Sequence, residues 1–186
     1  MPAQPFLWVF LLASAILAFI SRASISRPSS HGFIRFFVWE LILAMLYLNA
    51  AVWFEEPFSW HQIVSWILLA GSLVPLVLGI SALRSHGKVD ASKRPESELL
   101  GFERTTSLVQ QGIFRHVRHP MYSSLLLLAW GVFFKRPTVL TAMLAALATG
   151  GVTLMARRDE AECQRVFGES YQRYMERTKR FLPLLF

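Results

Sequence analysis

Cysteine is almost absent from this sequence: Cys163 is the single cysteine among 186 residues. A lone cysteine excludes an intramolecular disulfide and a cysteine-rich metal site. Spacings typical of metal ligands, such as His-Glu-x-x-His, are absent as well, so we predict no metal. The sequence also contains no internal repeat. These absences argue against a disulfide-stapled, metal-binding or repeat protein.

Charge is scarce too, since charged residues make up 17% of the chain and hydrophobic residues 54%. A soluble domain of this size carries roughly 25% charged residues. Because the apolar surplus exceeds what one small water-soluble core can bury, we expect an all-α integral membrane bundle. The 19 Lys and Arg residues outnumber the 12 acidic ones. A basic excess can indicate nucleic-acid binding, but these charges are sorted by loop, which favours a lipid bilayer as the partner and predicts no nucleic acid.

Five apolar runs predict the spans of one domain that covers residues 1–186. They are residues 6–20, 33–54, 60–83, 121–134 and 138–155. A perpendicular span needs about 20 residues, so the second and third runs are long enough, the fifth is adequate, and the first and fourth are short. No Lys or Arg precedes Phe6, unlike the positively charged start of a signal peptide, and we therefore expect the first run to be a retained span.

The basic residues predict how the bundle is oriented. Seventeen of the 19 fall on one side: between the first and second runs, at the start of the second run (Arg35), between the third and fourth, and after the fifth. Lys135 and Arg136 alone fall on the other side. The positive-inside rule then places the N-terminus outside and the C-terminus in the cytoplasm. Residues 157–180 carry aromatic side chains at helical spacing among charges, which predicts an amphipathic helix on the cytoplasmic face.

Polar residues gather at the start of the fourth run, where Arg118-His119 precedes Pro120-Met121-Tyr122. Proline suits the first turn of a helix, so Arg118 and His119 are predicted at the N-terminal end of that helix, here called its mouth. The partial positive charge and free N–H groups there suit an anion, and arginine adds a bidentate donor for a carboxylate or phosphate. Basic residues at the ends of spans also serve as headgroup anchors, and spacing alone leaves the two interpretations equal.

Acidic residues supply the remaining candidates. Asp159 and Glu160 follow the fifth run among arginines, where they form either surface ion pairs worth about 0–1 kcal/mol or a site for a cationic ligand. Glu40 lies inside the second run, where a carboxylate is costly and indicates function. Pairing with Arg35 near the interface is the simpler interpretation of Glu40.

Two motifs within residues 99–183 resemble the isoprenylcysteine carboxyl methyltransferase family and its phospholipid N-methyltransferase relatives. The first motif is the stretch from Gly112 to Tyr122, centred on Arg118-His119-Pro120-x-Tyr122. The second is Asp159-Glu160, then Phe167-Gly168-Glu169-x-Tyr171-x-x-Tyr174, then Arg177 and Leu182-Pro183. Asp159 stands where the family carries the first glutamate of a pair.

The resemblance implies a membrane enzyme that uses S-adenosylmethionine to methylate a lipophilic acceptor arriving from the bilayer. The residues it implies for the cofactor site are Gly112, His119, Pro120, Tyr122 and Glu160. It implies Arg118 and Glu160 as the catalytic residues, acting by position and charge, because in-line methyl transfer depends mainly on orientation.

Arg177 and Tyr174 are implied near the substrate, and Glu40 joins them because it lies inside a span. The acceptor stays open among a prenylated cysteine carboxylate, a phospholipid amine, a thiol and a small lipophile, and the oligomeric state is also open. The small size and the lack of targeting signals suit a bacterial inner membrane.

Two other functions compete. An NADPH-dependent reductase of the sterol-reductase group resembles the tail through Arg158-Asp159-Glu160-x-x-Cys163, although such enzymes have about twice as many spans. A non-enzymatic membrane scaffold accounts for the helices and the positive loops, but not for two polar motifs at matching spacing. The short chain and the Arg118-His119-Pro120 motif favour methyl transfer.

Overall fold

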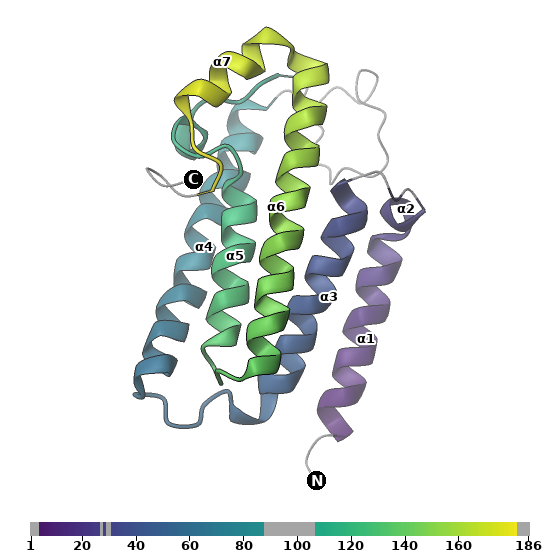
Figure 1. Ribbon diagram of the computed structural model, residues 1–186, viewed down its shortest axis with the longest axis vertical. Helices are drawn as coiled ribbons and strands as arrows, with labels where there is room; N and C mark the ends of the chain where they lie inside the picture. The colour runs from purple at the N-terminus through teal and green to yellow at the C-terminus, as the bar shows by residue number, and fades with distance from the viewer. Residues whose placement is uncertain (1–3, 27, 29–30, 88–106, 182–186) are drawn as a thin grey trace.

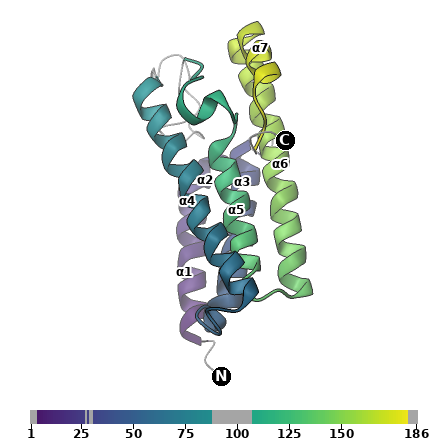
Figure 2. The ribbon, with the colours of Figure 1, turned by 90° about the vertical axis from the view of Figure 1, so that its left-hand side faces the viewer.

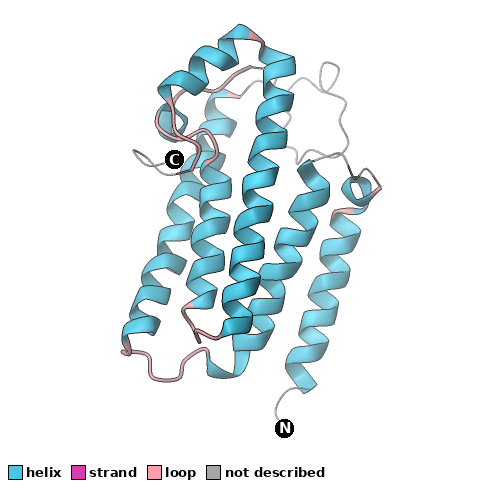
Figure 3. Ribbon diagram, viewed as in Figure 1, coloured by secondary structure: helices cyan, strands magenta, loops and turns pink. Residues whose placement is uncertain are grey.

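The computed structural model describes residues 4–26, 28, 31–87 and 107–181. Over these residues the chain is helical, with one isolated bridge and no strand (Figure 3). The elements are α1 (Gln4–Ile20), α2 (Arg22–Ile25), α3 (His31–Asn49), the 3₁₀ turn η1 (Ala50–Val52), α4 (Trp60–His86), the 3₁₀ turn η2 (Gly112–Arg115), α5 (Pro120–Phe133), α6 (Val139–Phe167) and α7 (Glu169–Arg177).

The long helices alternate in direction and form one bundle (Figures 1 and 2). Helix α4 packs along α5, α5 packs on α6, and α6 packs along α3. The core lies between α3, α5 and α6 and includes Val38, Met45, Ala148 and Val152, each at most 1% exposed. Helix α1 packs on α3 at the outside of the bundle. The order of packing brings α5 and α6, which carry the two sequence motifs, into direct contact.

Among the described residues, three helices are long and apolar enough to cross a membrane: Gly32–Val52, Trp60–His86 and Val139–Phe167. Phe6–Ile20 and Pro120–Phe133 are shorter apolar helices that run alongside them. Large apolar side chains, among them Leu73, Val77 and Leu147, cover the outside of these helices. An apolar exterior is what the hydrocarbon core of a bilayer requires, so the structure confirms the all-α membrane bundle.

The C-terminal helices differ from the prediction. Helix α6 does not end near residue 155 but continues to Phe167, and α7 alone forms a separate helix. Residues 156–167 contain neither glycine nor proline, and the chain turns at Gly168, whose φ of +55° favours glycine. The predicted amphipathic helix over 157–180 was therefore wrong in its extent.

The segment between the third and fourth apolar runs is partly helical, because α4 continues to His86 and η2 spans Gly112–Arg115. Its basic residues Lys88, Lys93 and Arg94 lie outside the described residues, as does Arg104. Leu182 and Pro183 at the end of the second motif also lie outside them.

Lys135 is buried at the opposite end of the bundle from α7. Its Nζ donates a hydrogen bond to Gln62 Oε1 at 2.9 Å and lies 3.0 Å from the centroid of the Trp66 ring. The Trp53 ring lies 4.8 Å from the same atom. This cation–π and hydrogen-bonded cage ties the α5–α6 turn to α4 and to η1.

Helices α3 and α6 approach each other closely at Gly151. We therefore predict that alanine substitutions at the adjacent Gly150 and Gly151 have different effects on stability. A Cβ at Gly151 would lie 2.6 Å from Val38 Cγ2, whereas a Cβ at Gly150 would meet nothing within 4 Å. We expect Gly151→Ala to destabilise the bundle by about 1–3 kcal/mol through overpacking. Gly150→Ala should be neutral or stabilising by about 0.5–1 kcal/mol, because it removes the entropy cost of a helical glycine. Thermal unfolding in detergent measures both, and equal midpoints would contradict the prediction.

Candidate functional site

The two sequence motifs meet where the chain after α7 runs beside the chain before α5. Residues 178–181, here called the C-terminal strap, form a parallel bridge between Lys179 and Val117. The Arg118 N–H donates to the Lys179 carbonyl at 2.8 Å, and the His119 N–H donates to the Arg180 carbonyl at 3.1 Å. Helix α5 begins at Pro120 as predicted, with His119 as its N-cap. The strap therefore holds the mouth of α5 from outside.

Glu160 lies at the centre of the site, buried on the upper part of α6. Its Oε1 accepts hydrogen bonds from Arg118 Nε at 3.0 Å, His119 Nε2 at 3.3 Å and Arg180 Nε at 3.1 Å. Its Oε2 accepts one from Arg180 Nη2 at 2.7 Å. A buried carboxylate is tolerated when cations and hydrogen bonds compensate it, and here two arginines and the His119 imidazole do so.

His119 links this carboxylate to a second one. Its Nδ1 lies 3.5 Å from Asp159 Oδ2, on the other side of the ring from Glu160. The imidazole stacks on the Tyr122 ring at 5.1 Å between centroids and 9° between planes, and the Tyr122 hydroxyl donates to Asp159 Oδ2 at 3.3 Å. Burial by itself lowers the pKa of His119, but hydrogen bonds to both carboxylates and their negative charge outweigh burial and raise it above 6.5.

The raised pKa of His119 predicts how stability changes with pH. Because the folded chain holds this proton more tightly than the unfolded one, the stabilisation is complete below pH 6.5 and is lost as pH rises through the raised value. We expect the difference in unfolding midpoint between the wild type and His119→Gln to be largest below pH 6.5 and to shrink as the pH rises above it. The exposed neighbour His116, changed to Gln, is the control. A constant difference for His119→Gln would contradict the prediction.

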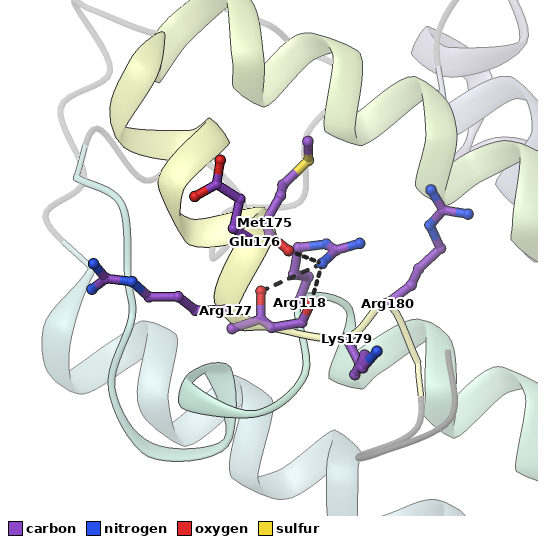
Figure 4. Close-up of a pocket in the computed structure, with 7 residues that line it drawn as sticks. Arg118, Met175, Glu176, Arg177, Lys179 and Arg180 are labelled. Atoms are coloured by element: carbon purple, nitrogen blue, oxygen red, sulfur yellow. Dashed lines mark hydrogen bonds between the residues drawn. The ribbon is translucent and has the colours of Figure 1, made fainter.

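Arg118 faces the protein interior and not the lipid headgroups. Besides Glu160, it reaches the end of α7, where its Nη1 donates to the Met175 carbonyl at 3.0 Å and, at shorter range, to the Thr178 carbonyl (Figure 4). One guanidinium thus binds the central carboxylate and two backbone carbonyls. Arg118 fastens the C-terminal strap and α7 to the site.

Tyr174 fixes α7 against η2. Its buried hydroxyl donates to the Phe114 carbonyl at 2.7 Å, and burial raises its pKa, so the hydroxyl stays protonated and keeps donating. The η2 turn begins at Gly112, where φ is +60° and a side chain would be strained. Tyr174 and Gly112 therefore shape the wall around the cluster.

A cavity of about 370 Å³ lies beside Arg118, under the C-terminal strap (Figure 4). It is lined by Arg118, Met175, Glu176, Arg177, Thr178, Lys179 and Arg180. Four of these side chains are basic and one is acidic, so the cavity favours an anionic group.

The structure brings together most of the predicted residues, but not all of them. Arg118, His119, Tyr122 and Glu160 share one hydrogen-bonded cluster, whereas Glu40 lies at the contact between α1 and α3. There its Oε2 accepts a hydrogen bond from the Ser14 hydroxyl at 2.7 Å. Arg177 is exposed at the rim of the cavity, apart from Glu160.

Sequence reasoning missed Arg180 and left the role of Asp159 open. Arg180 stands among seven basic residues after the fifth apolar run, and no local pattern separates it from the others. Only the pairing of the strap with residues 116–119 turns Arg180 toward Glu160.

The model of a family described as phospholipid methyltransferase matches residues 60–170, which is more than half of the chain. No curated protein and no solved structure matches this chain. The matched range includes Arg118, His119, Asp159 and Glu160, and it ends before the C-terminal strap.

Proposed function

This chain belongs to the phospholipid methyltransferase family and is therefore an S-adenosylmethionine-dependent membrane methyltransferase for a lipid-like acceptor, and we propose that its cofactor binds at the cluster around Glu160. The observation that supports this location is the buried Glu160 carboxylate, held between cationic groups at the mouth of α5. It lies inside the range that the family model matches.

The charges of the cluster fit those of the cofactor. S-adenosylmethionine carries an α-ammonium, an α-carboxylate and a sulfonium, and when bound it supplies the electrophilic methyl group. Glu160 provides a buried anion for a cationic group, and the arginines around it suit a carboxylate. The stacked rings of His119 and Tyr122 give one wall of the site a flat aromatic surface.

The residues act mainly by position and charge. Glu160 binds the cationic end of the cofactor, and Arg118 positions Glu160 while it holds the strap. The two ring nitrogens of His119 face Asp159 and Glu160 at 3.5 Å and 3.3 Å, and these carboxylates raise its pKa, so neither nitrogen is free to accept a proton from the acceptor. We propose that Tyr174 and Arg177 shape the acceptor side of the cavity, and that Glu40 contributes through the α1–α3 contact.

The acceptor that these features favour is a lipophilic molecule with an anionic head. The cavity beside Arg118 is basic, and a site without a ready base suits a nucleophile that is already an anion. An isoprenylcysteine carboxylate has an anionic head, and this head is itself the nucleophile. A phospholipid has an anionic head in its phosphate, but the phosphate is not the nucleophile.

The lengths of α5 and α6 support access from the bilayer. Helix α5 ends and α6 begins at the same turn. Helix α5 has 14 residues and is about 21 Å long, whereas α6 has 29 residues and is about 44 Å long. The hydrocarbon core of a bilayer is about 30 Å thick. The mouth of α5 therefore lies deeper than the end of α6, which rises beyond it (Figure 1). A site at this depth is within reach of a lipid headgroup.

We also propose that the end of the bundle with α7 faces the cytoplasm, because 17 of the 19 basic residues fall on that side. The N-terminus is then outside. A reporter that is fluorescent only in the cytoplasm, fused to the C-terminus, tests the orientation. A fusion protein without fluorescence would indicate the opposite orientation.

Calorimetry on the detergent-purified protein tests the cofactor, with NADPH as the control ligand. We expect saturable binding of S-adenosylmethionine, no binding of NADPH, and weaker binding after His119→Ala. Absence of S-adenosylmethionine binding to folded protein would overturn the proposed site, and NADPH binding would support a reductase.

Transfer of a labelled methyl group to candidate acceptors in vesicles then tests the substrate. We expect labelling of the prenylated cysteine carboxylate to exceed that of phosphatidylethanolamine. The opposite order would assign an amine acceptor.

A further inference from the structure

The two oxygens of Glu160 are not equivalent. Oε1 has three donors, from Arg118, His119 and Arg180, which leaves no favourable direction for another. Within the described chain, Oε2 receives one donor, Arg180 Nη2 at 2.7 Å. A carboxylate oxygen can accept two hydrogen bonds. A cationic ligand that reaches Glu160 therefore approaches Oε2 and meets Arg180 there.

Arg180 is also the partner of Glu160 that is easiest to move. Its side chain is 29% exposed, compared with 11% for Arg118 and 6% for His119. Arg118 is tied to two backbone carbonyls, and releasing it would detach the C-terminal strap. Arg180 also lines the cavity of about 370 Å³, which offers its guanidinium another position.

We propose that Arg180 binds the α-carboxylate of S-adenosylmethionine, whose zwitterionic amino-acid end inserts into the Glu160–Arg180 ion pair. This inference rests on the proposed cofactor site. The α-ammonium takes the place of Nη2 at Oε2, and the released guanidinium pairs with the carboxylate beside it. One ion pair becomes two, and no charge is left without a partner.

Charge balance favours this exchange over simple displacement. An ammonium that only displaced Arg180 would add a cation to a site that already holds Arg118, and like charges there are unfavourable. The carboxylate of the same ligand compensates Arg180 at once. Arginine suits this role because its planar guanidinium can bind a carboxylate through two hydrogen bonds.

The inference differs from the sequence-based expectation, in which Arg118 or the mouth of α5 receives the carboxylate. Arg118 already uses Nε and Nη1 on groups of the protein. The N-terminal end of α5 is covered by the strap, and the Ser123 hydroxyl in its first turn donates to the Phe181 carbonyl at 2.6 Å. Arg180 is the cation of the cluster that can change partners without dismantling the strap.

Decarboxylated S-adenosylmethionine separates the carboxylate from the rest of the cofactor. In calorimetry we expect the wild type to bind S-adenosylmethionine about 10- to 100-fold more tightly than the decarboxylated analogue. Arg180→Gln should lose most of this preference, while its affinity for the analogue changes little or rises. Arg180→Lys should keep part of the preference. Arg173→Gln, which removes an equal charge from the exposed face of α7, should keep all of it.

Equal losses for both ligands in Arg180→Gln would overturn the inference, because they would indicate a general or structural effect. An unchanged preference would overturn it as well. Hydrogen exchange at the Arg118 and His119 amides, which bond to the strap, verifies that the strap is intact in each variant. If the folded wild type bound neither ligand, the proposed cofactor site would fail and this inference with it; the other outcomes concern Arg180 alone.

Discussion

Glu160→Gln is expected to lower both cofactor affinity and methyl transfer by at least about 100-fold. Glutamine keeps the shape of the side chain but not its charge, so Arg118, His119 and Arg180 lose their common counter-charge. Removing one partner of a buried ion pair costs about 3–5 kcal/mol, which corresponds to more than a 100-fold change in an equilibrium constant. Calorimetry with S-adenosylmethionine and transfer of a labelled methyl group measure the two effects.

Glu169→Gln is the matched control, because Glu169 is an exposed carboxylate at the start of α7. We expect it to change either quantity by less than about threefold, as surface charges usually do. If Glu160→Gln kept an affinity within about threefold of the wild type, Glu160 would not be the central group of the cofactor site.

Arg118→Lys is expected to have the second largest effect, because lysine cannot bind the Glu160 carboxylate and the two carbonyls of Met175 and Thr178 together. The ammonium can keep one of these partners. Glu160 retains His119 and Arg180 as donors, but at least one of the two carbonyls loses the Arg118 donor, at about 1–3 kcal/mol. We predict at least about a tenfold loss of cofactor affinity. We also predict faster hydrogen exchange at the His119 amide, which the strap protects.

Arg115→Lys serves as the control for Arg118→Lys, since Arg115 is exposed at the end of η2. Loss of affinity without faster exchange would show that Arg118 acts on the cofactor directly and not through the strap. Unchanged affinity and exchange would remove Arg118 from the site altogether.

The start of α5 and the apolar helices were predictable because their signals are local. Pro120 marks the first turn of α5, and the apolar runs give the course of the helices through the membrane. The end of α6 was not predicted, since the change from apolar to charged residues near Met155 suggested a boundary. Helix formation depends on backbone propensity, and the helix ends only where Gly168 permits a positive φ.

The contacts of the site depend on residues that are far apart in the sequence. Arg118 and Glu160 are separated by 42 positions, and the strap carbonyls that Arg118 and His119 use lie 61 positions further along the chain. A single sequence contains no local signal for such pairings. Glu40 illustrates the opposite case, because its position in a span drew attention to it, and the structure places it beside Ser14. Its contribution to substrate binding stays a prediction.

The unequal lengths of α5 and α6 have a consequence for the membrane itself. In the proposed orientation the turn at Lys135 lies at the outer boundary of the bilayer, and α5, about 21 Å long, is shorter than the hydrocarbon core of about 30 Å. The distance from the mouth of α5 to the opposite headgroups is therefore set by the acyl chains of the surrounding lipid. In lipids with short chains the mouth meets the headgroups, and in lipids with long chains a layer of hydrocarbon separates them. The enzyme should consequently be selective for membranes of a particular thickness, even when the acceptor is the same.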